Sequence, residues 1–432
     1  MRERIKSVIL FVLIITSVFL TTKLLFGRPY WETASPPAYE QVTFGDLRPL
    51  QEQILPVLRL GEDVDWLQLQ PWDEGYQEAW EWLNWLFRPR QAPTTTSLPD
   101  FTGLQVRLDF SLPVEPNWWV TNRQLNGLEI RQAVWFAEAP QAVWYQAANG
   151  KWLRGELTLP EQWESQLNEL FAVGLKLRAA AAEELAIQPA AGSVLLPQEV
   201  PRLAVHTITA ENLETEKLLG SFFVNLALVR RIEEGDGAVI YTDGQKGLRI
   251  FSHGELEFNA PENIPGANPQ SLVDTLQQGA QYLQLMGGWP DHLYLQKAQL
   301  TAQSIKWEQR YTQELIFQSV QKGVPLLGTN PTLRLYFSDR GVIYYHRQIY
   351  LLGSPVGTPS PLVKPHQAVA AVAAALGTAV EEQRLVAVSP VLYFGSKATR
   401  QSLARPVWQV QLQDEQTAVV DGFTGEFITW LE

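Results

Sequence analysis

The sequence predicts an α+β protein in which a single N-terminal transmembrane helix precedes a multidomain extracytoplasmic region. Three observations support this prediction. An apolar segment lies near the N-terminus, short apolar runs are separated by turn dipeptides, and the C-terminal half repeats a pattern of strands and one helix. One helix on one face of an antiparallel sheet is a standard α+β layer arrangement.

Composition limits the classes of function. The 432 residues allow two to four domains at about 100–200 residues per domain. The net charge of −12 argues against a nucleic-acid-binding surface, because phosphate neutralisation needs clustered Lys and Arg. The chain contains no cysteine, which excludes disulfides, thiolate metal sites and cysteine nucleophiles.

The membrane anchor is predicted over residues 8–26. Only Lys23 is charged in this segment, and at about 1.5 Å per residue a helix of this length spans a hydrocarbon core of about 30 Å. Tyr30 and Trp31 follow where an interfacial aromatic belt is expected. The basic residues within 1–6 place the N-terminus in the cytoplasm and the bulk of the chain outside. The expected location is therefore the cell membrane, with a single pass.

A cleaved signal peptide is the competing interpretation. The apolar run is long for a signal peptide, and residues 21–26 contain no small-residue cleavage pattern, which favours an uncleaved anchor. No second segment of comparable length follows, since the Ala-rich stretch at 368–380 is too short to span a bilayer.

The region after a short tether at 33–37 contains a helix pattern and several strand patterns. Tyr76, Trp80, Leu83 and Phe87 recur at helical spacing, and Asp73 is a candidate N-cap. Short strands are predicted at 105–110, 133–137, 142–147 and 153–157, with Asn149-Gly150 as a hairpin turn, followed by a helix from Thr158 toward Leu185 and a linker at 189–201.

The C-terminal half contains a weak internal repeat of the form ββαββ. Residues 238–258 and 333–351 each predict strands around a turn, and alignment of Gly247 with Gly341 relates them. Predicted helices at 269–285 and 365–376 follow the two hairpins, and each helix is followed by further strands. The last strands are predicted at 407–412 and 418–420, before a turn at 421–425.

These patterns divide the chain into four segments. They are a cytoplasmic stub with the anchor at 1–27, an N-terminal extracytoplasmic domain at 28–200, a central α+β domain at 201–330 and a C-terminal α+β domain at 331–432.

The sequence predicts no catalytic, cofactor-binding or metal-binding residues. It contains no zinc-protease, P-loop, nucleophile-elbow or Rossmann motif, and its five histidines show no i, i+4 pair. Two carboxylate groups, at 62–65 and 233–236, allow a calcium loop or an acid/base pair, but neither fits an EF-hand and both resemble solvated turns. We therefore expect a protein that is not an enzyme.

Sixteen tryptophans are unevenly distributed, with most of them before residue 164. Trp80, Trp82 and Trp85 are expected to pack a helix on a sheet, although exposed Trp can also bind sugars or anchor a partner. Trp118 and Trp119 differ, because adjacent residues on a strand point to opposite sides. If that segment is a strand, one of the two is exposed, and this makes the pair a candidate partner contact.

The chain resembles the YycH (WalH) regulatory proteins of Gram-positive bacteria. The resemblance rests on the short basic N-terminus with a single anchor, the hairpin YTDGQKGLRIFSHGELEF and the duplicated C-terminal units, and it covers nearly the whole chain. The ending VWQVQLQDEQTAVVDGFTGEFI is also similar to PepSY modules, in which a strand leads to a D-x-x-T-G turn.

The resemblance implies an accessory regulator of a two-component system that governs cell-wall metabolism. The implied partners are the sensor histidine kinase (WalK, YycG) and the sister regulator (WalI, YycI), whose fold the last two domains are expected to share. The anchor would contact the transmembrane helices of the kinase. Thr16 and Ser17 are candidate contacts near its centre, because hydroxyl groups favour an interhelical partner, although they also bond to their own helix.

Two other classes of function remain open. An extracytoplasmic cell-wall or peptide-binding module would bind its ligand without the anchor. An enzyme with an unrecognised site would lose activity on a single substitution without unfolding.

Overall fold

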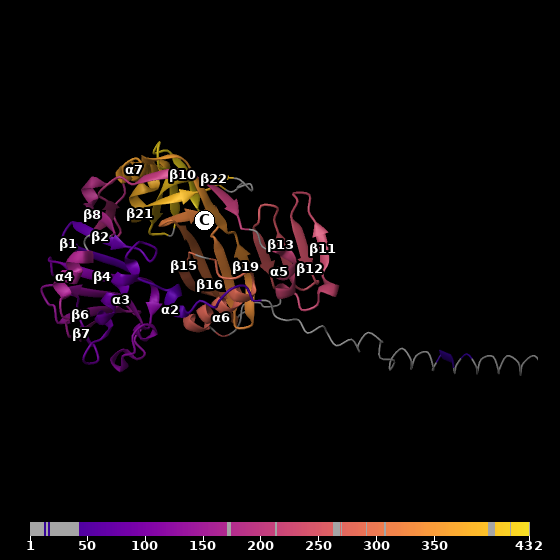
Figure 1. Ribbon diagram of the computed structural model, residues 1–432, viewed down its shortest axis with the longest axis horizontal. Helices are drawn as coiled ribbons and strands as arrows, with labels where there is room; N and C mark the ends of the chain where they lie inside the picture. The colour runs from indigo at the N-terminus through magenta and orange to yellow at the C-terminus, as the bar shows by residue number, and fades with distance from the viewer. Residues whose placement is uncertain are drawn as a thin grey trace, which may run out of the picture. The chain divides into compact units, whose positions relative to one another are not determined.

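The computed structural model describes residues 13, 16, 17, 43–170, 174–211, 214–261, 268, 270–290, 292–305, 308–395, 402–414 and 416–431 (Figure 1). The chain divides into two units, Met1–Val42 and Thr43–Glu432. Within the described residues no helix is both long and apolar enough to cross a membrane. The predicted anchor at 8–26 lies almost entirely outside these residues, so it stays a prediction.

The first part of the second unit is a nine-stranded antiparallel sheet, drawn in indigo to magenta in Figure 1. Its strand order is β3-β7-β6-β5-β4-β1-β2-β8-β9. The strands are β1 (Val57–Glu62), β2 (Asp65–Leu69), β3 (Thr94–Thr96), β4 (Gln105–Val114), β5 (Ile130–Phe136), β6 (Ala142–Ala147), β7 (Trp152–Glu156), β8 (Leu175–Ala181) and β9 (Ser193–Pro197). The four predicted strands correspond to β4 to β7, and Asn149-Gly150 forms the predicted turn between β6 and β7.

Helices cover one face of this sheet. They are α2 (Leu50–Gln53), α3 (Tyr76–Leu83) with the 3₁₀ turn η2 (Asn84–Phe87), and α4 (Trp163–Leu170). Trp135 lies in the same buried cluster as Trp80 and Phe87, whereas its neighbour Val134 lies in a separate small cluster. Because alternate residues of a strand face opposite sides, this separation defines the covered face. The predicted helix and the core role of its tryptophans are confirmed.

The predicted N-cap of this helix is wrong. Gly75, not Asp73, occupies the N-cap position of α3, so no side chain caps this helix. The Asp73 carboxylate instead accepts a hydrogen bond from the backbone N of Gln70 at 2.7 Å. Asp73 therefore closes a turn over residues 70–73, and the helix begins three residues later, at Tyr76.

The helix predicted from Thr158 toward Leu185 is also wrong in its second half. α4 ends at Leu170, and β8 follows as an antiparallel neighbour of both β2 and β9. The Ala-rich run at 179–182 favours a helix by intrinsic propensity, but strand pairing on both sides overrides this preference. The predicted linker at 189–201 likewise contains β9.

The second part is a fifteen-stranded sheet. Its main path is β11-β12-β13-β14-β19-β18-β16-β17-β21-β22-β10-β20, with β15 beside β16 and the pair β23 and β24 beside β22. The strands are β10 (Arg202–Ala210), β11 (Arg230–Glu233), β12 (Val239–Thr242), β13 (Gly247–Ile250), β14 (Leu256–Asn259), β15 (Leu293–Ile305), β16 (Glu308–Gln321), β17 (Val324–Leu327), β18 (Leu333–Ser338), β19 (Gly341–Arg347), β20 (Tyr350–Pro361), β21 (Leu385–Tyr393), β22 (Ser402–Leu412), β23 (Thr417–Asp421) and β24 (Phe427–Leu431).

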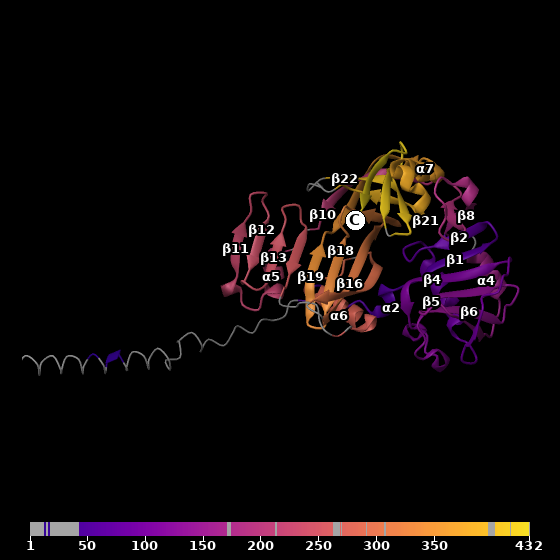
Figure 2. The same ribbon diagram turned by 180° about the vertical axis from the view of Figure 1, so that it is seen from behind.

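Three helices pack on this sheet: α5 (Thr215–Phe222), α6 (Leu272–Leu285) and α7 (Pro365–Leu376). Ser271 caps α6, because its side chain accepts a hydrogen bond from the backbone N of Asp274. Leu276, Ala280 and Leu283 form the buried face of α6, which lies beside β16 (Figure 2). The predicted helices at 269–285 and 365–376 are thus confirmed within a few residues.

The predicted repeat is only partly correct. The hairpin of the second copy, β18–β19, lies between β14 and β16 of the first copy, with Phe258 opposite Tyr345 and Leu315 opposite Leu335. The two copies therefore form one sheet, because the second copy's hairpin pairs with β14 on one side and with β16 on the other.

The last part of the chain follows the prediction. α7 packs against β22, β23 and β24, and Trp408 is fully buried among them. The turn after β23 forms as expected, since the Asp421 carboxylate accepts hydrogen bonds from the backbone N of Phe423 and of Thr424.

The predicted domain boundary at residue 200 coincides with a change of sheet, whereas the boundary at residue 330 does not. The chain changes sheets between Pro197 and Arg202, whereas the ladder of β16 and β18 runs across residue 330. In addition, Ile187 and Val194 share a buried cluster with Leu385 and Val372. Which segments fold alone stays a prediction.

Candidate binding pocket and its buried ion-pair network

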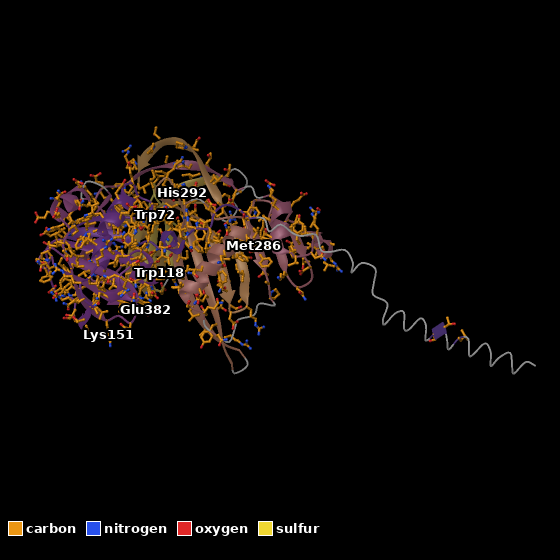
Figure 3. The ribbon with its side chains drawn as sticks, turned by 60° about the horizontal axis from the view of Figure 1, so that its bottom comes forward. Trp72, Trp118, Lys151, Met286, His292 and Glu382 are labelled. Carbon is orange, nitrogen blue, oxygen red and sulfur yellow. The ribbon has the colours of Figure 1, made fainter. Side chains whose placement is uncertain are left out.

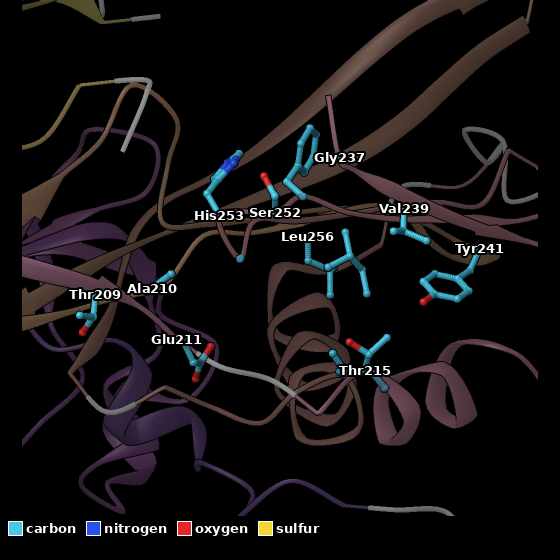
Figure 4. A pocket seen from close by; sticks show the side chains of 14 residues that line it. Thr209, Ala210, Glu211, Thr215, Gly237, Val239, Tyr241, Ser252, His253 and Leu256 are labelled. Atoms are coloured by element: carbon cyan, nitrogen blue, oxygen red, sulfur yellow. The ribbon is translucent and has the colours of Figure 1, made fainter. Parts of the chain in front are cut away.

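A cavity of about 500 Å³ lies between the end of β10, α5 and the strands β12 to β14 (Figure 4). Its apolar lining comes from Leu218 on α5 and from the sheet residues Val239, Ile250 and Leu256. Its polar lining residues include Thr209, Glu211, Thr215, Ser252 and His253.

The turn between β13 and β14 forms one wall of this pocket. The sequence predicts a turn at His253-Gly254, and the backbone N of Gly254 donates to the carbonyl of Phe251 at 3.0 Å. Gly254 has a φ of +95°, and a Cβ there would lie 2.9 Å from the Cβ of Ala210. Glycine is therefore required for this turn to approach the end of β10.

Glu211, which lines the pocket, forms a buried ion pair with Arg347. Arg347, at the end of β19, is 1% exposed. Its Nε donates to Oε2 of Glu211 at 2.9 Å and its Nη2 donates to Oε1 at 2.9 Å, while Nη1 donates to the carbonyl of Gly288 at 2.7 Å. This bidentate arrangement is the strong form of an Arg–carboxylate contact. Burial opposes the charge of Arg347, but Tyr345 and Glu211 outweigh it and raise the pKa of Arg347.

A second buried carboxylate lies beside this pair. Nε2 of His253 and Nε2 of His346 approach the two oxygens of Glu255 at 2.7 and 2.9 Å. Because an ionised carboxylate only accepts hydrogen bonds, we assign both Nε2 atoms as donors. Gln348 adds a longer contact at 3.4 Å. Glu255 therefore joins the pocket turn to β19 through side chains.

Burial by itself raises the pKa of Glu255, because it penalises the carboxylate. The hydrogen bonds and charges of His346 and His253 act in the opposite direction and hold its pKa below the usual value. The ionised form is thus the stable form in the folded protein.

The pocket lining is better suited to a small amphipathic ligand than to a cation. Both oxygens of Glu211 are already used by Arg347, so this carboxylate has little capacity to hold a cation. Hydroxyl-bearing side chains of Thr209, Thr215 and Ser252 line the pocket together with apolar residues. Such a lining suits a small amphipathic group or a side chain of a partner. Among the described residues no cluster of three metal-ligating side chains occurs.

The structure places the predicted contact residues Trp118 and Trp119 on a 3₁₀ turn, not on a strand. Both are partly buried, and Trp118 is labelled in Figure 3. Trp119 stacks on Phe110 with ring centroids 5.4 Å apart, and its Nε1 donates to the carbonyl of Gln51 at 3.0 Å. The segment is not a strand, because Pro116 starts the turn, so opposite strand faces do not separate the two side chains. Their role as a partner contact stays a prediction.

The other predicted residues lie apart from the pocket. Thr16 and Ser17 are helical and exposed within the first unit. The carboxylates at 62–65 lie exposed at the β1–β2 turn. Glu233 and Glu234 form ion pairs with Arg231 and Arg249, respectively, at the end of β11.

Sequence reasoning missed the two carboxylate networks. Glu211 and Arg347 are 136 positions apart, and Glu255 and His346 are 91 apart. The only local signal is that His253 and Glu255 are two positions apart across the predicted turn at His253-Gly254. The second partner comes from β19, whose pairing with β14 the sequence pattern does not show.

We compared the sequence and the structure with known proteins. No protein-family model and no curated protein matches the sequence. YycH from Bacillus subtilis matches the structure with a TM-score of 0.58 at 12% identity, over 87% of this chain and 97% of that chain. An uncharacterized protein from Eubacterium rectale matches with a TM-score of 0.39 at 11% identity, over 62% of this chain and 98% of that chain.

The structure thus defines an α+β protein built on two large, predominantly antiparallel sheets. Its particular fold is that of YycH, which confirms at the level of fold the resemblance noted from the sequence.

Proposed function

We propose that this protein is a membrane-anchored, extracytoplasmic accessory regulator of a cell-wall-sensing histidine kinase of the WalK (YycG) type. It acts through protein–protein contacts and not through catalysis. The observation that carries the proposal is the fold of YycH, matched over 87% of this chain. The segments at 238–258 and 333–351, whose patterns suggested the YycH family from the sequence, form strands of this structure.

The proposed contact with the kinase has two parts. The first is the apolar segment at 8–26, which would lie beside the transmembrane helices of the kinase, with Thr16 and Ser17 near its centre. The second is the extracytoplasmic region, for which Trp118 and Trp119 are the candidate contacts. We further propose that the central and C-terminal parts are PepSY-like units related to a sister regulator of the YycI (WalI) type, which would be a second partner.

Affinity purification from native membranes tests this proposal. The tagged full-length protein is compared with a version in which residues 8–26 are replaced by an unrelated transmembrane helix. We expect a sensor histidine kinase to co-purify with the native protein and to be lost, or reduced at least about tenfold, with the replaced helix, because packing between membrane helices depends on side-chain fit.

The double substitution of Thr16 and Ser17 by Leu refines the test, because it keeps the segment apolar. Weaker co-purification with unchanged membrane insertion supports these two contacts. Recovery of the kinase with both anchors would assign the contact to the extracytoplasmic region. Absence of any kinase with either anchor would contradict the proposal.

The second candidate function is an extracytoplasmic cell-wall or peptide-binding module. The pocket beside Glu211 favours it, because a cavity of about 500 Å³ with mixed apolar and hydroxyl lining is of ligand-binding size. If no kinase co-purifies, binding of cell-wall glycan and peptide fragments to the whole protein, compared with a variant that fills the pocket (Thr215→Trp), becomes the deciding measurement.

A further inference from the structure

The strand β11 ends the fifteen-stranded sheet with an open edge. Within the described part of the chain its only strand neighbour is β12. All four of its residues are exposed, and Ile232 is 48% exposed. Leu228, just before the strand, is 64% exposed. Open edges with apolar side chains are sites where a further strand can pair.

The hairpin after β11 shows which backbone groups point outward. The backbone N of Glu234 donates to the carbonyl of Ala238 at 2.8 Å, so Glu234 bonds inward, toward β12. Alternate residues of an antiparallel strand bond to the same neighbour. Ile232, which lies opposite Ile240, therefore also bonds inward. The N–H and C=O groups of Arg231 and Glu233 point to the open edge.

The charged side chains of β11 are arranged so that two antiparallel copies of the strand would be complementary to each other. Arg231 and Glu233 lie symmetrically about Ile232 on one face of the sheet, where they form an ion pair within the strand. Arg230 and Glu234 lie symmetrically about it on the other face. A twofold axis through Ile232, perpendicular to the sheet, would place each Arg opposite a Glu of the other copy, and Ile232 opposite itself.

We propose that β11 pairs antiparallel with β11 of a second copy of this chain, with Ile232 on the twofold axis. The outward groups of Arg231 would bond to those of Glu233 in the other copy, and the reverse, which gives four backbone hydrogen bonds. Ile240, the cross-strand neighbour of Ile232, would extend the apolar contact to four isoleucine side chains on one face.

The charges select this register over its neighbours. A twofold axis perpendicular to a continuous sheet keeps the two faces in common, so only registers that differ by two residues in the pairing compete. An axis through residue 231 places Arg231 opposite Arg231, and an axis through residue 233 places Glu233 opposite Glu233. Like charges directly opposite each other are destabilising, so the register centred on Ile232 is favoured.

Charged residues on an edge strand often prevent pairing. That effect relies on repulsion or on the cost of burying a single charge. Here each positive residue has a negative counterpart at the symmetric position, and Arg230 has no ion-pair partner among the residues that the structure describes. The contact involves few residues, so we expect a weak, concentration-dependent dimer of the class that buries less than about 1,200 Å².

The absence of cysteine from the chain allows a direct test by site-specific crosslinking. In the proposed dimer the two Cα atoms at position 232 form a non-hydrogen-bonded pair about 4.5 Å apart, which is within reach of a disulfide. The two Cα atoms at position 231 would be about 8–9 Å apart and out of reach. We therefore expect full-length Ile232→Cys, in detergent or in membranes, to form disulfide dimers under mild oxidation.

Val356→Cys is the matched control, because Val356 is 50% exposed and lies on the edge strand β20. Dimers should form at least about tenfold faster at position 232 than at position 356 or in Arg231→Cys, because only position 232 satisfies disulfide geometry. Equal rates at positions 232 and 356 would overturn the proposal.

Charge exchange tests the register independently. In the Ile232→Cys chain, Arg231→Glu alone places Glu opposite Glu, and Glu233→Arg alone places Arg opposite Arg, so either change should slow crosslinking. The double change Arg231→Glu with Glu233→Arg restores opposite charges and should restore the rate. Failure of the double change to recover the rate, in variants with unchanged circular dichroism, would overturn the proposed pairing.

Discussion

At the scale of the residue, Glu255 connects the turn that forms one wall of the pocket to β19. It is 8% exposed and is held by two histidines, His253 in the turn before β14 and His346 on β19. A buried carboxylate without such partners would be protonated or would disrupt its surroundings. Its hydrogen bonds therefore tie the turn at His253 to β19.

The acid dependence of stability should reveal this residue. Because the pKa of folded Glu255 lies below its ordinary value of 4.5, its stabilising contribution is complete above about pH 4.5. The contribution is lost as the pH falls through the lower folded pKa. Glu255→Gln should lower the free energy of unfolding near neutral pH by about 1–3 kcal/mol and remove this part of the acid dependence.

Urea unfolding between about pH 3 and pH 7 measures this effect. Glu257→Gln is the control, since Glu257 lies two residues further along the chain, on β14, and is only partly buried. A Glu255→Gln protein with the same pH profile as the unchanged protein would show that the two histidines do not stabilise the carboxylate.

At the scale of the element, β8 shows how tertiary pairing overrides local preference. The run at 179–182 is entirely alanine, and alanine is the best helix former. Gly174 precedes β8 with a φ of +101°, and a Cβ at this position would lie 2.9 Å from the carbonyl oxygen of Gln68. The glycine thus lets β8 enter the sheet beside β2.

Alanine substitution separates backbone strain from steric contact. Gly174→Ala should lower the free energy of unfolding by about 2–4 kcal/mol, because it adds a clash to an unfavourable φ. Gly192→Ala is the matched control: its φ is +78°, but no heavy atom lies within 4 Å of the added Cβ, so a cost of about 1 kcal/mol is expected. Thermal or urea unfolding gives both values, and equal costs would show that the contact with Gln68 is unimportant.

At the scale of the whole molecule, the residues from 43 onward share their cores between the two sheets. One buried cluster contains Leu58 and Leu108 of the first sheet together with Phe317 and Tyr345 of the second. The backbone N of Ala190 also donates to the carbonyl of Leu385 at 2.8 Å. Shared cores couple the unfolding of the parts that contribute to them.

We therefore expect the two sheets to unfold together. Eleven of the sixteen tryptophans lie between Trp66 and Trp163, so tryptophan emission reports mainly on the first sheet, whereas far-UV circular dichroism reports on both. The urea midpoints of the two signals should coincide. Separate midpoints would instead show that the predicted N-terminal domain at 28–200 unfolds independently.

Local sequence patterns were sufficient for several elements. The helix at Tyr76, the strand β6 and the helix α7 follow from spacing and turn residues, and the turn at Asp421 follows from its D-x-x-T-G sequence. The α+β class and the resemblance to YycH came from the same patterns. These features depend on residues close together in the chain, and their periodicity is therefore visible in the sequence.

Only the tertiary structure decided how the elements combine. The insertion of β18 and β19 between β14 and β16, the strand at β8, the turn at Trp118 and the contacts of Glu255 all depend on pairing between distant segments. Backbone groups that pair strands are the same in nearly every residue, so the choice of neighbour leaves little trace in the sequence. The open edge at β11 became visible for the same reason, since an edge exists only once the order of the strands is known.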